Sequence, residues 1–334
     1  MTMNQSLVKT DPAGALTSER IDPQRLRANY AKFKANEMSA NTRKTYVSQW
    51  RAFEMWCKAN GLPALPAEAV TLSAYMEHLY DRGKQRSTID IARAAIKWHH
   101  LDAGYSNPFS DAELVKMYGG LIRTLADEGR TTPHVKPTIN LEDLRAMSRA
   151  CGDTLIGLRD RALVLVAYAG WMRRAEPLKL RVEAMEWHAD YVRCWLGATK
   201  TDQTGAANEY ITVPKIDDDD LCGYRALRAW LDAAGITAGA VFVKITYGKL
   251  SHVPLARDNY INEIVERAAK RAGLDAGRIA PHRAFRASPI TAAAHADENP
   301  ALISKRARHK SFETTKKYID RNAGDDVRVG RAAY

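Results

Sequence analysis

The segment RHKSFETTKKYI, residues 308–319, decides how the rest of the chain is interpreted. Tyr318 follows His309 by nine residues, among five cationic side chains if the histidine is counted, which suggests chemistry on a polyanion. A phenol has an ordinary pKa of about 10, so its attack on a phosphodiester requires removal of the proton and stabilisation of charge on the phosphate. A lone tyrosine on an amphipathic helix normally only packs and hydrogen-bonds. A nucleophilic role therefore needs arginine, lysine and histidine partners elsewhere in the chain.

The same segment predicts a helix near the end of the chain. Ser311 can cap this helix, and Phe312, Thr315 and Ile319 then fall on one face that packs against a core. Tyr318 would lie beside that buried face, near its edge, with its oxygen able to reach outward. Packing would thus hold the ring without covering the reactive atom.

Composition and charge narrow the class of protein. The 334 residues are enough for two domains, each with its own core. Fifty Lys plus Arg against 39 Asp plus Glu give a net charge of +11, spread over both halves, which favours nucleic acid over a membrane anchor as partner. The four cysteines lie far apart without metal-ligand spacing, so we expect reduced thiols of a cytoplasmic protein. No stretch approaches the roughly 18 apolar residues of a membrane span.

Periodicity predicts a mainly α protein with a small β-sheet, organised in four parts. Residues 1–22 are expected to be a flexible, mostly polar arm, and residues 23–125 a helical domain. Residues 126–138 are polar, contain two prolines and lack periodicity, so we place a linker there. Residues 139–334 are expected to form a mixed α+β domain with a C-terminal tail.

Two helices of the helical domain are expected to carry cations in their first turns. The first starts at Ser39 or Asn41, and the second is opened by Ser87 or Thr88. The head of the first helix carries Thr42, Arg43 and Lys44 and is expected to face outward. The basic run at residues 82–86 places cations at the start of the second helix, where backbone N–H groups also favour phosphate, and an exposed basic loop is the alternative.

The mixed domain carries its candidate residues at the ends of predicted elements. Asn140 is expected to cap a helix, and residues 158–170 to form a largely buried one that ends before Arg173. Residues 190–214 alternate like strands, with Lys200 in a turn. Further helices are predicted at residues 224–234, 258–272, 286–295 and 300–306.

The combined order of these residues resembles one family. The residues that match are Arg173, Lys200, Arg286, His309 and Tyr318. Over about residues 23–325 the chain resembles the tyrosine recombinases, the integrase family that includes Cre recombinase and the Xer proteins. The family's first arginine is followed three residues later by a glutamate, which Glu176 matches, and its histidine and tyrosine show the same spacing of nine.

The resemblance implies a reaction in which Tyr318 attacks a DNA phosphodiester and forms a 3′-phosphotyrosine and a free 5′-hydroxyl. Arg173 and Arg286 would bind the non-bridging oxygens, whose charge grows in the transition state. Lys200 would protonate the departing 5′-oxygen, and His309 would donate a hydrogen bond to the phosphate. The phosphotyrosine retains the energy of the broken bond, so the resemblance implies no cofactor and no metal ion.

The resemblance also implies partners for the protein. The helical domain would be the core-binding domain, and with the catalytic domain it would form a C-shaped clamp around double-stranded DNA. Its implied DNA contacts are Thr42, Arg43, Lys44, Arg86, Ser87 and Thr88. The target would carry inverted repeats, and four protomers would assemble on two such sites. The protein would then be cytoplasmic, encoded by a bacterium or phage and associated with the nucleoid. Glu176 would orient neighbouring groups in the site.

One position departs from the family pattern. The residue three places before the second arginine is usually a histidine, and here it is Arg283, with His282 one place earlier. Either Arg283 contacts the phosphate, or the loop shifts by one residue and His282 takes the usual place. Arginine stabilises phosphate charge but cannot accept the tyrosine proton near neutral pH.

Two other functions fit the same sequence. A DNA-binding protein of this fold that has lost recombination would be consistent with Arg283 and with Pro177, which replaces a commonly aliphatic residue. A type IB topoisomerase would share the nucleophile chemistry but relax DNA without exchanging partners. The separate helical domain, with two candidate reading helices, favours site-specific recombination.

Overall fold

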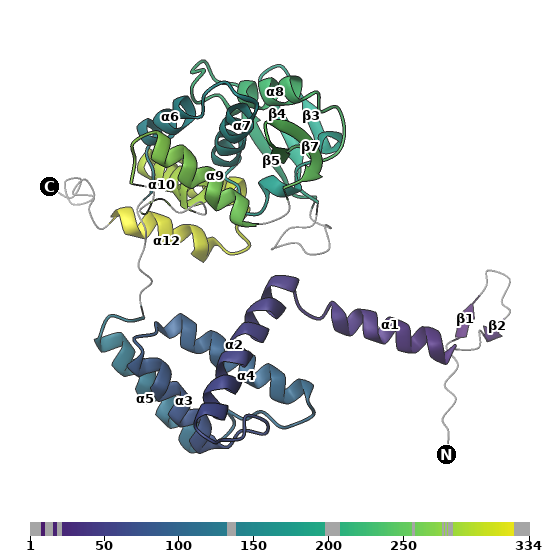
Figure 1. Cartoon of the computed structure of the whole chain (residues 1–334), viewed down its shortest axis with the longest axis vertical. Helices are drawn as coiled ribbons and strands as arrows, with labels where there is room; N and C mark the ends of the chain where they lie inside the picture. The colour runs from purple at the N-terminus through teal and green to yellow at the C-terminus, as the bar shows by residue number, and fades with distance from the viewer. Residues whose placement is uncertain are drawn as a thin grey trace. The chain divides into compact units, whose positions relative to one another are not determined.

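The chain divides into two compact units, Met1–His134 and Val135–Tyr334. The computed structural model describes residues 8–10, 16–18, 22–131, 138–197, 208–255, 258–275, 277, 279 and 283–323 (Figure 1). The division between the units lies within residues 126–138, where the sequence predicts a linker. Among the described residues, helices predominate, and the strands form one three-stranded and two two-stranded sheets. The predicted class, mainly α with a small β component, is confirmed.

The first unit begins with a short strand pair, in the segment for which the sequence predicts a flexible arm. β1 (Val8–Thr10) pairs antiparallel with β2 (Leu16–Ser18). Helix α1 (Pro23–Ala35) follows, and the Asp22 side chain caps it by accepting the N–H of Gln24 at 2.9 Å. Proline at the first helical position suits this start, since its missing N–H would have no partner there.

The core of the first unit lies between four helices. These are α2 (Ala40–Ala59), α3 (Ala69–Asp81), α4 (Arg86–Asp102) and α5 (Ala112–Asp127). Phe53 and Cys57 of α2 are fully buried in one cluster with Leu72 and Met76 of α3. α2 packs along α4 (Figure 1). The apolar faces of these helices are buried in this core, and their polar faces remain available to solvent or a ligand.

One of the two predicted helix starts in this unit is confirmed. Ser39 caps α2, because its hydroxyl accepts the N–H of Thr42 at 3.1 Å. The cap fixes the first turn of α2, which begins at Ala40, three residues before Arg43. The candidate DNA contacts therefore lie on a helix with a defined beginning.

The other predicted start is wrong by one or two residues. α4 begins at Arg86 with Gln85 in the cap position, so Ser87 and Thr88 lie inside its first turn rather than opening it. The N–H of Arg86 donates to the carbonyl of Arg130 at 3.2 Å, a contact with the far end of the unit that local sequence does not reveal. Arg86 thus belongs to a helix and not to a solvated loop.

The second unit surrounds the buried helix α7. Its helices are α6 (Leu141–Ala150), α7 (Leu155–Ala169), α8 (Gly223–Ala234), α9 (Asp258–Arg271), α10 (Ser288–His295), α11 (Pro300–Ala307) and α12 (Phe312–Ala323). Its short turns are η1 (Pro177–Lys179), η2 (Val182–Ala184) and the π-helical η3 (Arg283–Ala287). Its strands are β3 (Met185–Trp187), β4 (Tyr191–Trp195), β5 (Tyr210–Pro214), β6 (Val243–Thr246) and β7 (Lys249–Pro254).

The packing of α7 fixes the loop that follows it. Residues 162–167 are buried on every side, and α8 packs along this helix (Figure 1). Trp230 of α8 is fully buried, and its indole N–H donates to the carbonyl of Val241 at 2.8 Å. The antiparallel sheet β3-β4-β5 lies on the same core, with Val192 paired to Val213. The chain therefore leaves α7 at a rigid position, just before Arg173.

Candidate active site

Four of the predicted site residues meet in the second unit. Arg173 lies in the loop after α7, Arg286 in η3, His309 after α11 and Tyr318 in α12. Nη1 of Arg286 donates to the carbonyl of Trp171 at 3.0 Å. The rings of His309 and Tyr318 stack with their centroids 6.0 Å apart. Three segments that are distant in the sequence are thus joined in one site.

Arg173 is held in place by Glu176. Its Nη1 donates to Oε1 of the carboxylate at 2.7 Å, and its backbone N–H donates to Oε2 at 2.8 Å. Its Nη2 donates to the carbonyl of Arg308 at 3.1 Å. The Arg173 side chain remains 18% exposed, whereas that of Glu176 is 5% exposed. The carboxylate therefore serves to orient a guanidinium that a ligand can still reach.

Arg286 is fixed by two backbone carbonyls. One is that of Trp171, and the other is that of Ala307, which accepts from Nη2. Burial, followed by the nearby charges of Arg173 and Arg308, lowers the pKa of Arg286 to about 10. The guanidinium is still charged at neutral pH, but it lies among like charges in a partly dry environment. An anion placed there would relieve this repulsion.

His309 is uncharged at neutral pH. Burial, followed by the charges of Arg286, Arg173 and Arg308, lowers its pKa to about 4. Its Nδ1 forms a hydrogen bond of 2.8 Å with the hydroxyl of Thr315. A neutral imidazole that accepts the hydroxyl proton at Nδ1 carries its own proton on Nε2. His309 can therefore donate a hydrogen bond without carrying a charge.

Tyr318 is half-buried at the edge of a small hydrophobic cluster. The cluster contains Trp171, Ile290, Ala293, Ile303 and Ala307. The predicted face of the helix is only partly right, because Thr315 is fully buried and Ile319 half-buried, but Phe312 is 51% exposed. Phe312 is the first residue of α12, and the buried position is taken by Thr315, whose hydroxyl contacts His309.

Arg308 and Glu209 belong to the site, and sequence reasoning missed both. Nη2 of Arg308 donates to Oε2 of Glu176 at 2.6 Å, and its Nε lies 3.7 Å from Oε2 of Glu209. Glu209 also lies 3.8 Å from Nη1 of Arg173. The position of Arg308 next to His309 was a signal that could have found it. Glu209, just before β5, shows no comparable signal.

Arg283 begins the π-helical turn η3, three residues before Arg286. Its carbonyl accepts the hydroxyl proton of Ser288 at 2.9 Å, and its side chain is half-buried. The helix predicted to begin at Arg286 instead begins at Ser288. This segment differs from the predicted helix start because the hydroxyl of Ser288 also accepts the N–H of Ile139, at 2.9 Å. A contact from outside the segment therefore helps to shape the π turn.

Two predicted site residues lie outside the described residues. They are Lys200, the candidate general acid, and His282, the alternative to Arg283. Their roles, and the choice between His282 and Arg283, therefore stay predictions.

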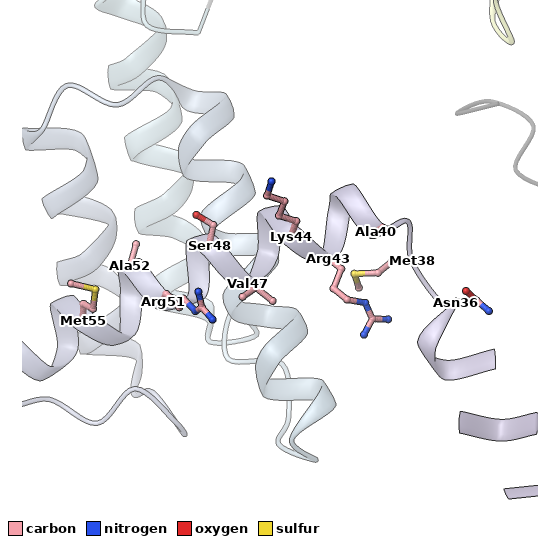
Figure 2. A pocket seen from close by; sticks show the side chains of 10 residues that line it. All are labelled: Asn36, Met38, Ala40, Arg43, Lys44, Val47, Ser48, Arg51, Ala52 and Met55. Atoms are coloured by element: carbon pink, nitrogen blue, oxygen red, sulfur yellow. The ribbon is translucent and has the colours of Figure 1, made fainter. Parts of the chain in front are cut away.

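The head of α2 presents the first set of candidate DNA contacts. Thr42, Arg43 and Lys44 lie in its first turns, and Thr42 forms a hydrogen bond of 2.8 Å with the hydroxyl of Ser39. A groove of about 790 Å³ follows α2, and Arg43, Lys44 and Arg51 are among the residues that line it (Figure 2). Cations thus occur along α2 beyond its head, although apolar side chains such as Val47 and Met55 share the groove.

The head of α4 presents the second set. Nε of Arg86 lies 3.5 Å from Oδ2 of Asp90, one turn further along the helix, and both side chains are about half exposed. Ser87 and Thr88 lie in the same first turn. A surface ion pair of this kind contributes little stability, so Arg86 can exchange Asp90 for a phosphate at small cost.

The described residues contain neither a group of metal-ligating side chains nor a membrane-spanning helix. Within the described part of the chain, no group of three or more His, Cys, Asp or Glu side chains is arranged to hold a metal ion. None of the described helices has the length and apolar character needed to cross a membrane.

The sequence of this chain is similar to those of a known family and of two curated relatives. Residues 138–324 match the Phage integrase family. The chain is 31% identical over 284 residues to the integrase/recombinase xerD homolog of Selenomonas ruminantium, covering 84% of this chain and 81% of that protein. It is 27% identical over 296 residues to a tyrosine recombinase of Synechococcus elongatus, covering 84% and 85%.

A solved structure shares the fold. The integrase of the Tn1549 transposon, in complex with transposon right end DNA, superposes with a TM-score of 0.58 and 16% sequence identity. The match covers 88% of this chain and 93% of the integrase.

Proposed function

Since the chain belongs to the phage integrase family and is a tyrosine-type site-specific DNA recombinase, we propose that Tyr318 is its nucleophile and that Arg173 and Arg286 bind the scissile phosphate. The observation that carries this proposal is the convergence of two fixed guanidiniums and a neutral histidine beside the phenol. Such donors favour a transition state in which charge grows on the non-bridging oxygens.

In the proposed reaction the phenol oxygen of Tyr318 bonds to phosphorus, and the bond between phosphorus and the 5′-oxygen breaks. The DNA 3′ end is then held as a phosphotyrosine, and the 5′-oxygen leaves as a hydroxyl after taking a proton from Lys200. The phenol proton passes to water while His309 donates its remaining N–H to a phosphate oxygen. In the alternative route, the other tautomer of His309 accepts the phenol proton on Nε2 and makes no hydrogen bond to the phosphate. Attack by the 5′-hydroxyl of a second DNA strand reverses the steps and completes the exchange.

A Lys200→Ala variant should cleave ordinary DNA more slowly, by about 10²- to 10⁴-fold, which is the usual range for a general acid. A substrate with sulfur in place of the departing 5′-oxygen should restore the rate, because a thiolate leaves without protonation. The measurement is the rate of covalent complex formation on both substrates. Arg173→Ala is the matched control, since sulfur should not rescue a lost phosphate contact. An equal Lys200→Ala defect on both substrates would assign Lys200 another role.

The proposed DNA surface of the first unit includes the heads of α2 and α4. Support comes from the cap that sets Arg43 on α2 and from the exposed position of Arg86 on α4. With the second unit they would enclose the duplex as a clamp. Arg283 would add a phosphate contact in the second unit.

Arg43→Ala and Arg86→Ala should each weaken DNA binding and reduce its dependence on salt. A contact with one phosphate contributes about one unit to the slope of log affinity against log salt concentration. Lys58→Ala is the matched control, because Lys58 is exposed on the last turn of α2, away from its head. If the slope stays the same in both arginine variants, the helix heads do not contact DNA phosphates.

The proposed substrate is duplex DNA with inverted repeats around a short spacer, bound in pairs by four protomers in the cytoplasm. The DNA that flanks the gene should contain such a repeat. When two labelled fragments carrying it are mixed with the protein, recombinant joints should form without any nucleotide cofactor. A protein that binds the fragments and never joins them would instead be a DNA-binding protein without strand transfer, and relaxation of supercoiled DNA without joints would indicate a topoisomerase.

A further inference from the structure

Arg308 occupies an unusual place for an arginine. It ends α11 in the left-handed conformation, with φ 54° and ψ 48°, which costs a residue with a Cβ more than it costs glycine. Its side chain is only 8% exposed. Burial lowers the pKa of its guanidinium, so the charge is held there against a desolvation cost. A backbone that favours glycine and a dry environment both act against arginine, which points to a specific use of its side chain.

The guanidinium of Arg308 connects the acidic groups of the site. Its Nη2 donates to Oε2 of Glu176 at 2.6 Å, and its Nε lies 3.7 Å from Oε2 of Glu209. Its Nη1 donates to the carbonyl of Gly170 at 3.3 Å. The backbone carbonyl of Arg308 accepts a hydrogen bond from Nη2 of Arg173 at 3.1 Å. Arg308 therefore contacts both carboxylates that lie near Arg173, and it also contacts Arg173 itself.

The net charge of the candidate active site depends on Arg308. Among the described side chains of the cluster, three guanidiniums face two carboxylates, so one positive charge is in excess. Without Arg308 the two carboxylates would cancel the two remaining guanidiniums. An entering phosphodiester carries one negative charge, and its transition state concentrates more charge on the non-bridging oxygens. A neutral cluster would stabilise that state far less in a partly buried site.

We propose that the side chain of Arg308 is a positioning group for phosphate binding: it neutralises Glu176 and Glu209, so that the Arg173 guanidinium is available to the scissile phosphate. This role rests on the proposed function, because it concerns the same phosphate site. The Arg308 side chain acts through the two carboxylates and does not itself touch the DNA.

The test uses Arg308→Gly in the full chain, because glycine accepts the left-handed backbone. Covalent complex formation on a nicked duplex should slow by about 100-fold, the loss that a small misplacement of catalytic groups can cause. On a duplex with a methylphosphonate at the scissile position, which lacks the negative charge, the ratio of wild-type to variant rates should shrink. Adding Glu209→Gln to Arg308→Gly should recover part of the rate on ordinary DNA, since it removes one uncompensated carboxylate.

The outcomes separate this role from simple packing. If Arg308→Gly is as fast as wild type, if its defect is the same on both duplexes, or if Glu209→Gln recovers nothing, the proposal is overturned. Arg308→Asn, which also tolerates the left-handed conformation, replaces Arg308→Gly throughout if thermal unfolding shows that the glycine variant does not fold. A wild-type protein that captures neither duplex contradicts the proposed function itself, which distinguishes the two failures.

Discussion

Tyr318→Phe is expected to abolish covalent DNA capture and strand exchange while leaving DNA affinity nearly unchanged. Loss of the attacking oxygen should lower the rate by about 10⁴-fold or more, as for other removed nucleophiles. The ring should keep its place, because it packs against the cluster of Trp171, Ile290, Ala293, Ile303 and Ala307, and phenylalanine keeps the same ring. The measurement compares covalent complex on a nicked duplex with total binding in a gel shift.

The matched control for this variant is Tyr334→Phe. Tyr334 is the last residue and the other tyrosine near the end of the chain. Its substitution should leave capture at the wild-type level. A Tyr318→Phe protein that still forms a protease-sensitive DNA adduct would show that another residue attacks the phosphate.

Arg286→Ala should reduce cleavage by about 10²- to 10³-fold, the loss that follows removal of one charge-stabilising donor. The guanidinium is fixed by the carbonyls of Trp171 and Ala307, so it offers its remaining N–H groups to a phosphate in a defined direction. Arg286→Lys should also be strongly impaired, because an ammonium lacks the planar fork that binds two oxygens. The rate of covalent capture at saturating DNA measures both effects.

Arg306→Gln is the matched control for Arg286. The Arg306 guanidinium lies 4.9 Å from the centre of the Trp171 ring and donates to the carbonyl of Ala169 at 3.4 Å. It is thus an arginine of the same region that does not contact Glu176. Its loss should slow cleavage much less than the loss of Arg286. Equal defects in the two variants would mean that Arg286 supports the fold rather than the chemistry.

Local patterns were sufficient for much of the fold. The apolar run over residues 158–170 produced a buried helix, and Asn140 and Ser39 cap the helices that their side chains predict. These features depend on neighbours within a few residues, which a sequence displays directly. The order of Arg173, Arg286, His309 and Tyr318 was informative for the same reason, since each lies in or beside a recognisable element.

The features that sequence reasoning missed depend on distant contacts. Arg86 begins α4, where its N–H meets the carbonyl of Arg130. Thr315 is buried as its helix face predicts, but its hydrogen bond to His309 is a contact that the local pattern does not display. Glu209 and Arg308 enter the site from segments about 100 residues apart, and their relation exists only in the folded chain. From the sequence alone, Glu209 and Arg308 are each interpreted as ordinary charged residues of the surface. Their importance appears only when the charges of the whole site are considered together.

The most direct test of this account is to identify the residue that becomes linked to DNA. Wild-type protein is mixed with a nicked duplex carrying the flanking repeat, and the covalent complex is digested with trypsin and sequenced by mass spectrometry. The account predicts one DNA-linked peptide, modified at Tyr318 and joined to the 3′-phosphate of the cleaved strand. A link to another residue, a link to the 5′ end, or no covalent complex at all on a duplex that the protein binds would contradict it.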